Sequence, residues 1–135
     1  MKEIKAAVVG LGLGRHFVNA CAKNGAVGRL VICDTDTKRA DQVRAEVPRI
    51  AAAYAGLEEM LRAEKPDVVC IVTPDHMHRP QAEVCLAAGA HVLMTKPLST
   101  TLEDGKAIVR AAESSGKKLM VAHERRFRTR VKALK

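Results

Sequence analysis

The chain has 135 residues, of which 47% are hydrophobic and 28% charged, and it carries a formal net charge of +8 at pH 7. That balance is typical of a single globular domain and excludes a disordered chain. No apolar run reaches the ~20 residues of a membrane-spanning helix, and residues 1–5 lead directly into a predicted strand without a signal peptide. We therefore expect a cytoplasmic protein with no membrane partner.

The positive charge is concentrated at the end of the chain. Residues 117–135 hold eight Lys or Arg and one acid, whereas residues 1–116 hold fifteen bases and fourteen acids. A basic surface that binds nucleic acid is usually spread over a face, and this tail has few aromatic residues and no recognised nucleic-acid motif. Nucleic-acid binding is therefore the least favoured of the functions that the sequence suggests.

The first predicted elements are a strand at 4–10 and a helix at 14–24, joined by a glycine-rich loop. An apolar run ends in Gly10-Leu11-Gly12-Leu13-Gly14, and an amphipathic segment follows. Glycines let the backbone turn sharply and let a diphosphate approach the main-chain amides, while the N-terminus of the helix attracts the anion. The loop is predicted to bind phosphate, although the same spacing alone is also typical of an ordinary tight turn.

The third glycine of this loop departs from the usual spacing. Counted from Gly10, the pattern G-x-G-x-x-G places Arg15 where a small residue normally lets helix and strand approach closely. Either the loop is one residue shorter and Gly14 takes that place, or the helix lies further from the strand. We favour the shorter loop because Gly14 is otherwise unexplained.

The second strand, predicted at 29–34, ends in a carboxylate. Asp34 lies twenty residues after Gly14, where dinucleotide-binding folds place the acid that hydrogen-bonds the adenosine ribose. Thr35 or Asp36 then caps a helix that runs to Val47. Together with the glycine loop, Asp34 makes dinucleotide binding the favoured interpretation.

The remaining elements continue the alternation of strands and helices. We predict strands at 50–53, 67–73, 90–94 and 118–122, and helices at 56–65, 77–88 and 100–115. The last helix is predicted to begin with a capping box between Thr100 and Glu103. The pattern predicts an α/β fold with a doubly wound, mostly parallel, six-stranded, Rossmann-like sheet over residues 1–122. Ligands of such sheets bind at the carboxyl ends of the strands.

Polar residues gather directly after three of these strands. The segments are Thr73-Pro74-Asp75-His76-Met77-His78, Thr95-Lys96-Pro97-Leu98 and His123-Glu124-Arg125-Arg126-Phe127. Turn formation alone does not require so many polar residues at one edge of a sheet, so we expect the functional site there. The cysteines and histidines show no spacing typical of a metal site, and no metal is expected. Cys33 and Cys70 lie in apolar strands and are predicted to be buried free thiols.

These segments resemble the nucleotide-binding half of the glucose–fructose oxidoreductase / inositol dehydrogenase (Gfo/Idh/MocA) family, and the resemblance covers essentially the whole chain. The residues that carry it are the glycine loop, Asp34, the stretch from Thr73-Pro74 to His78, the lead from Gly89-x-His91-Val92 into Lys96-Pro97, and Arg126-Phe127. The resemblance implies a dinucleotide-binding domain followed by a second, sheet-containing domain. It also implies hydride exchange between NAD(P) and a carbinol carbon, often of a sugar or cyclitol.

The resemblance implies roles for individual residues. Lys96 matches a lysine near nicotinamide and substrate, where it could bond the reacting oxygen and help move its proton; a cis bond to Pro97 would aim it. A solvated loop lysine at 96 and a helix-start histidine at 78 are the plain alternatives. The residues that we expect to bind the cofactor are Gly10, Gly12, Leu13, Gly14, Asp34, Thr35, Arg39, Thr73, Pro74, His78, Thr95 and Lys96.

The expected cofactor is NAD, with NADP as the alternative. Asp34 repels a 2′-phosphate and so favours NAD. Thr35, Lys38 and Arg39 stand beside it and could receive that phosphate.

Two departures from the family's pattern bear on activity. The family usually has Glu-Lys-Pro where this chain has Thr95-Lys96-Pro97, so an acid that would hold or tune the lysine is missing. The chain also ends where the second domain should begin, and we interpret residues 123–135 as a basic tail that starts the linker to it. The chain on its own is therefore expected to be inactive.

Two main hypotheses follow. The first is the nucleotide-binding domain of an NAD(P)-dependent oxidoreductase, whose small polyhydroxylated substrate binds when the second domain is present. The second is a non-catalytic dinucleotide-binding module, such as a sensor or a partner subunit, which Thr95 and the short chain favour. We also expect some self-association, including a homo-oligomer as one outcome, through apolar and basic surface left uncovered at 119–135.

Overall fold

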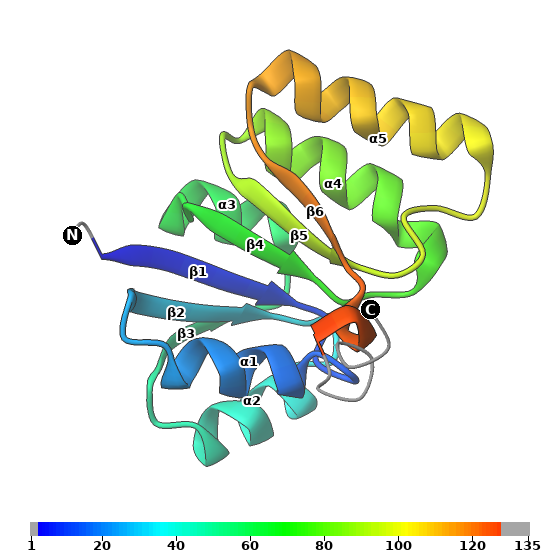
Figure 1. The fold of residues 1–135 in the computed structure, drawn as a ribbon. Coiled ribbons are helices and arrows are strands. Elements are labelled where there is room, and N and C mark those ends of the chain that lie inside the picture. The colour runs from blue at the N-terminus through cyan, green and yellow to red at the C-terminus, as the bar shows by residue number, and fades with distance from the viewer. Residues whose placement is uncertain (1–2, 128–135) are drawn as a thin grey trace.

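The computed structural model describes residues 3–127, which form a parallel six-stranded sheet with helices on both faces (Figure 1). The strands are β1 (Ile4–Val9), β2 (Val27–Cys33), β3 (Ile50–Tyr54), β4 (Val68–Ile71), β5 (His91–Thr95) and β6 (Leu119–Ala122). The helices are α1 (Arg15–Lys23), α2 (Thr37–Glu46), α3 (Leu57–Glu64), α4 (His78–Ala87) and α5 (Leu102–Ser115), with 3₁₀ turns η1 (Asp75–Met77) and η2 (Glu124–Phe127). The predicted doubly wound α/β fold is confirmed.

The strand order is β3-β2-β1-β4-β5-β6, and all neighbouring strands are parallel. The chain builds outward from β1 to β3 on one side and then returns to add β4 to β6 on the other. The order therefore reverses between β1 and β4. In open parallel sheets, the crevice at such a switch point is where ligands bind.

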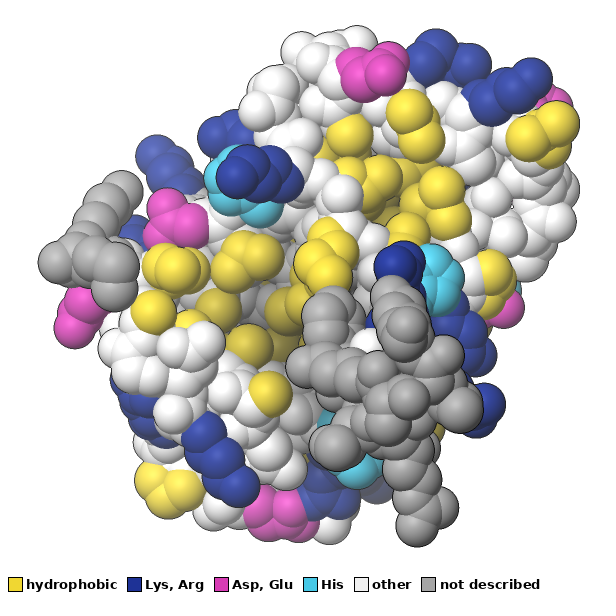
Figure 2. Space-filling view, in the orientation of Figure 1, with side chains coloured by type: hydrophobic (Ala, Val, Ile, Leu, Met, Phe, Trp, Pro, Cys, Tyr) yellow, Lys and Arg dark blue, Asp and Glu magenta, His cyan; other side chains and the backbone are white. Residues whose placement is uncertain are grey.

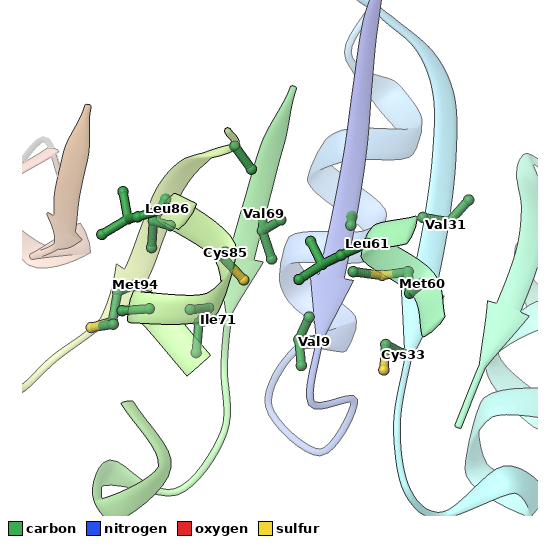
Figure 3. Packing of buried hydrophobic residues seen from close by; sticks show 14 of the residues in the cluster. Val9, Val31, Cys33, Met60, Leu61, Val69, Ile71, Cys85, Leu86 and Met94 are labelled. Carbon is green, nitrogen blue, oxygen red and sulfur yellow. The ribbon is translucent and has the colours of Figure 1, made fainter. Parts of the chain in front are cut away.

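Two layers of apolar side chains hold the helices to the sheet. On one face, α3, α4 and α5 pack against the strands; Figure 3 shows Met60 and Leu61 of α3 and Cys85 and Leu86 of α4 lying against them. On the other face, α1 and α2 cover the sheet through side chains that include Val18 and Val43. Strands in such a sandwich must be apolar on both sides, which explains the unbroken apolar runs of β1 and β4.

The helix ends follow local backbone chemistry. The Asp36 side chain caps α2 by accepting a hydrogen bond of 3.0 Å from the Arg39 amide, one of the two caps expected there. The predicted capping box at Thr100 and Glu103 is wrong by one residue, because Thr101 caps α5 and accepts a bond of 3.1 Å from the Asp104 amide. Ala107 and Ile108 of α5 are buried against the core.

Several predicted boundaries shift by a few residues. β2 begins at Val27, two residues before its predicted start, and β4 ends at Ile71, two residues before its predicted end. The 3₁₀ turn η1 then precedes α4. The Lys96–Pro97 bond is cis. In the part of the chain that is described, no helix is both long and apolar enough to cross a membrane.

The predicted division into a domain over 1–122 and a tail over 123–135 stays a prediction. Glu124–Phe127 form η2 at the carboxyl end of β6. Residues 128–135, which hold most of the predicted tail, lie outside the described residues.

Candidate functional site

A cavity of about 670 Å³ opens at the carboxyl ends of β1, β2 and β4, beside the point where the strand order reverses. Its volume falls in the range of roughly 300–1,000 Å³ that is usual for small-molecule and cofactor sites. The sequence-predicted residues that line it are Gly10, Gly12, Leu13, Asp34, Thr35, Arg39, Thr73 and Pro74. The fold therefore brings the glycine loop, the end of β2 and the loop after β4 to one crevice.

Gly10 and Gly14 shape the glycine loop by packing. Gly10 has a φ of 84°, and a Cβ added there would lie 2.5 Å from the carbonyl oxygen of Val72. A Cβ on Gly14 would lie 1.9 Å from the carbonyl oxygen of Gly10. Gly14 thus takes the close-approach position at the start of α1, and the shorter loop is confirmed over the alternative that uses Arg15.

Gly12 lies on the open side of the same loop. A Cβ added at Gly12 would meet no atom within 4 Å, and Gly12 lines the cavity. Within residues 3–127, the amides of Gly12 and Leu13 have no hydrogen-bond partner, and no side chain caps the N-terminus of α1. Unpaired amides at a helix N-terminus form a ready site for an anion such as a diphosphate.

Asp34 ties the second strand to the glycine loop. Its carboxylate is 8% exposed, and it accepts hydrogen bonds from the amides of Leu11 (2.8 Å) and Asp36 (2.9 Å). Each carboxylate oxygen has a second lone pair, so Asp34 keeps acceptor capacity for a ligand hydroxyl. The Arg39 guanidinium lies 3.4 Å from Asp34 and 3.3 Å from Asp36, and its half-exposed side chain also lines the cavity.

Other cavity residues were not predicted from the sequence. Ala55 and Leu57 follow β3, and Gln81 belongs to α4, whereas Met77 of η1 lies in the segment 73–78 where the functional site was expected. The Thr73 hydroxyl donates a hydrogen bond of 2.6 Å to Gln81, which fixes one wall. The rule that ligands bind at the carboxyl ends of strands could have identified Ala55 and Leu57, because it applies to β3 as well.

His78 contacts the loops after β4 and β5 and does not line the first cavity. Its side chain is fully buried at the start of α4. Nδ1 lies 2.9 Å from the carbonyl oxygen of Pro97, and Nε2 lies 3.1 Å from that of Thr73. His78 therefore links the loop after β4 to the loop after β5, and neither ring nitrogen faces the crevice.

Lys96 lies in a second cavity of about 570 Å³ at the same edge of the sheet. Its described lining residues are Lys96, His123, Glu124, Arg125 and Arg126. The neighbouring Thr95 is half-buried, and its hydroxyl donates a hydrogen bond of 3.4 Å to the carbonyl oxygen of Ile71. Of the residues predicted to bind the cofactor, Gly14, His78, Thr95 and Lys96 thus lie outside the first cavity.

The cysteines are free thiols within the described chain, and Cys33 and Cys70 are buried as predicted. Burial raises the pKa of Cys33 to about 11 and that of Cys85 to about 12. A hydrogen bond with Cys70 lowers the pKa of Cys21 to about 7 and raises the pKa of Cys70. Cys33, which lines the first cavity, therefore presents a neutral thiol to a ligand at pH 7.

Comparisons with known proteins place this geometry in a family. Residues 4–123 match the oxidoreductase family with an NAD-binding Rossmann fold. The chain is 30% identical over 124 residues to scyllo-inositol 2-dehydrogenase (NADP(+)) of Bacillus subtilis, covering 92% of the chain and 34% of that protein.

Two solved structures share the fold closely. An oxidoreductase from Agrobacterium radiobacter, in complex with NAD+, L-tartaric acid and magnesium, has a TM-score of 0.93 and 30% identity over 99% of this chain. The WlbA dehydrogenase from Bordetella pertussis, in complex with NADH and UDP-GlcNAcA, has a TM-score of 0.91 and 30% identity over the full chain. The chain covers 39% and 40% of these two structures, little more than a third of their length.

The family match over residues 4–123 agrees with the switch-point crevice, the open glycine loop and the carboxylate at the end of β2. The chain therefore belongs to the Gfo/Idh/MocA oxidoreductase family and contains its NAD-binding Rossmann fold.

Proposed function

We propose that this chain binds NAD, or NADP, in the first cavity and serves an oxidoreductase that acts on a sugar- or cyclitol-like carbinol. One observation carries the proposal. The unpaired amides of Gly12 and Leu13 open into the same crevice as the Asp34 carboxylate, at a switch point of a parallel sheet. A diphosphate and a ribose are the two parts of a dinucleotide that such groups bind.

The lining residues fit a dinucleotide along its length. The Gly12 and Leu13 amides would hold the diphosphate, since no Cβ intrudes on that side of the loop. Asp34 would accept from the ribose hydroxyls, while Ala55 and Leu57 offer an apolar surface suited to adenine. The nicotinamide end of the dinucleotide would lie towards Thr73 and Pro74, where the crevice meets the loop after β4.

When bound, the nicotinamide accepts or donates the hydride, and the chain's own part is to bind, orient and move a proton. Lys96 is the candidate for the proton, because its ammonium can donate a hydrogen bond to a carbinol or carbonyl oxygen. His78 helps to position the Lys96–Pro97 segment through the Pro97 carbonyl. Among the described residues, no acid pairs with Lys96.

A second candidate function is a non-catalytic dinucleotide-binding module. Thr95 favours it, because its hydroxyl is engaged with the Ile71 carbonyl and offers no charge to hold or tune Lys96. Such a module would bind dinucleotide as tightly as the enzyme domain. Unlike an enzyme domain, it would not reduce NAD+ with any carbinol, even after fusion to the second domain of a related enzyme.

Calorimetric titration with NAD+ and NADP+ tests the proposal. Asp34→Asn should weaken NAD+ binding by about tenfold, the size expected for one charge-assisted hydrogen bond, and affect NADP+ less. Arg39→Gln should weaken NADP+ selectively if that guanidinium receives the 2′-phosphate. Asp41→Asn, an exposed acid on α2 that does not line the cavity, is the control. If neither NAD+ nor NADP+ binds, the proposal is wrong.

A further inference from the structure

The second cavity is built by two neighbouring strands that end together. Thr95 of β5 and Ala122 of β6 are register partners in the parallel ladder. The next residues, Lys96 and His123, therefore leave the sheet side by side. η2 continues from His123, and the Arg126 amide donates a hydrogen bond of 3.0 Å to the His123 carbonyl, which turns the chain back at this edge.

The charge of this cavity is strongly positive. Lys96, Arg125 and Arg126 contribute three basic side chains, and Glu124 is the one acid among the described lining residues. None of these cations takes part in an ion pair or a hydrogen bond with another side chain of residues 3–127. Other exposed arginines, such as Arg62 and Arg110, also lack an acid partner among residues 3–127, but they do not line this cavity; what distinguishes the cavity is that three exposed basic side chains line it together.

Unpaired guanidinium groups gathered in a cavity suit an anion. A guanidinium presents a planar fork of N–H donors that matches the oxygens of a carboxylate or a phosphate. A neutral polyol offers no group that compensates several cations at close range. The cavity also contains Lys96, the residue proposed to act on the reacting oxygen, so an anion bound there would belong to the substrate.

We propose that the substrate is an acidic polyol, such as a sugar acid or a sugar phosphate, whose anionic group binds Arg125 and Arg126 while its carbinol lies at Lys96. This inference deepens the proposed function and rests on it. The first cavity takes the dinucleotide, and the second gives the reaction its substrate class.

Three sugars with the same ring provide the test: D-glucuronate, D-glucose 6-phosphate and D-glucose, which carry a carboxylate, a phosphate and a hydroxyl group at the sixth carbon. Because the proposed anion contacts belong to this chain, the anionic group should bind here even without a second domain. Each sugar is added to the ¹⁵N-labelled chain saturated with NAD+, and the amides of Lys96, His123, Arg125 and Arg126 are followed by NMR. At least one acid should bind about tenfold or more tightly than glucose, as expected for a charge-assisted contact. Preference for one acid identifies the anionic group as carboxylate or phosphate.

Two matched double variants complete the design. Arg125→Gln with Arg126→Gln should reduce the affinity for the acids to that for glucose. Arg62→Gln with Arg110→Gln, which removes two exposed arginines outside this cavity, should leave the preference unchanged. Equal binding of all three sugars, or a preference that survives loss of Arg125 and Arg126, would overturn the inference.

The same spectra keep the two proposals apart. The amides of Gly12 and Leu13 report NAD+ binding in the first cavity before any sugar is added. If NAD+ shifts the Gly12 and Leu13 resonances but the acidic sugars bind no more tightly than glucose, this inference is wrong and the proposed function is unaffected. Failure of NAD+ to shift them removes the proposed function itself, whatever the sugars do.

Discussion

Gly12 and Gly14 stand two residues apart in one loop and contribute differently. A Cβ on Gly14 would collide with the Gly10 carbonyl, whereas a Cβ on Gly12 would enter the cavity and touch no protein atom. Gly14→Ala should therefore lower the free energy of unfolding by roughly 1–3 kcal/mol, the usual cost of overpacking. Gly12→Ala should leave stability nearly unchanged and weaken NAD+ binding. Urea unfolding and nucleotide titration of both variants measure the two effects.

The two variants control for each other, because the substitution is identical and only the position differs. We expect Gly14→Ala to lower stability and Gly12→Ala to weaken NAD+ binding. If Gly12→Ala destabilised the fold as much as Gly14→Ala, the open side of the loop would not face the cavity.

Glu64 gives the fold a predictable response to acid. Its carboxylate accepts two hydrogen bonds from Arg29 (2.6 and 2.9 Å) and one from the Tyr54 hydroxyl (2.6 Å), and these lower its pKa from 4.5 to about 2. Because the pKa is lower in the folded state, the stabilisation is complete above the unfolded value and is lost as pH falls towards about 2. The free energy of unfolding should decrease between pH 5 and pH 2.

Urea titrations at pH 5, 4, 3 and 2 measure that decrease. The Glu64→Gln variant should show a shallower pH dependence over the same interval, since it cannot take up the proton. An equal slope in both proteins would assign the acid sensitivity to other carboxylates.

At the scale of elements, His78 couples the ends of β4 and β5. Replacing it with Phe removes both contacts, and at least one of the carbonyls of Thr73 and Pro97 loses the N–H that donates to it. The net contribution of a hydrogen bond is roughly 0.5–1.5 kcal/mol, so His78→Phe should lower the midpoint of thermal unfolding below that of the parent chain. His76→Phe, at an exposed position in η1, is the matched control.

If His78 also positions the loop after β5, His78→Phe should change the environment of that loop. Amide resonances of Lys96 and its neighbours should move even where the rest of the spectrum is preserved. Unchanged resonances around Lys96 would mean that His78 stabilises α4 without influencing the loop after β5.

The elements and about half of the residues that line the first cavity could be predicted from the sequence because their signals are local. Apolar runs mark the strands, and the position of Asp34 relative to the glycines depends on a strand and a helix of ordinary length. The position of Gly14 followed from the need for a small residue there. In contrast, the partners of His78 include a carbonyl nineteen residues away. Side-chain contacts at that separation depend on the packed fold and leave no local pattern.

Two further features could not be predicted from local patterns: the residue that caps α5, and the separation of Lys96 from the first cavity. Thr100 and Thr101 each precede an acid by three residues, so the local pattern alone does not distinguish the two possible caps. The family resemblance implies that Lys96 lies near the nicotinamide, which groups it with the cofactor residues. The structure places it in a separate cavity beside η2, which the alternation of strands and helices does not predict.

At the scale of the whole molecule, the chain leaves apolar surface exposed. Met120 on the edge strand β6 is 50% exposed, and Figure 2 shows hydrophobic side chains gathered across the middle of one face. Exposed apolar patches promote association. The sedimentation coefficient should therefore increase with concentration, and Met120→Lys should reduce that increase. Leu102→Lys, on α5, is the comparison; equal effects of both substitutions would exclude the β6 edge as the specific contact.

A crystal structure of the chain grown with NAD+ would show whether the first cavity binds the dinucleotide. We expect diphosphate oxygens within hydrogen-bond distance of the Gly12 and Leu13 amides, and adenosine ribose hydroxyls on the Asp34 carboxylate. A first cavity that stays empty at saturating NAD+, or a dinucleotide bound at a different edge of the sheet, would contradict this expectation.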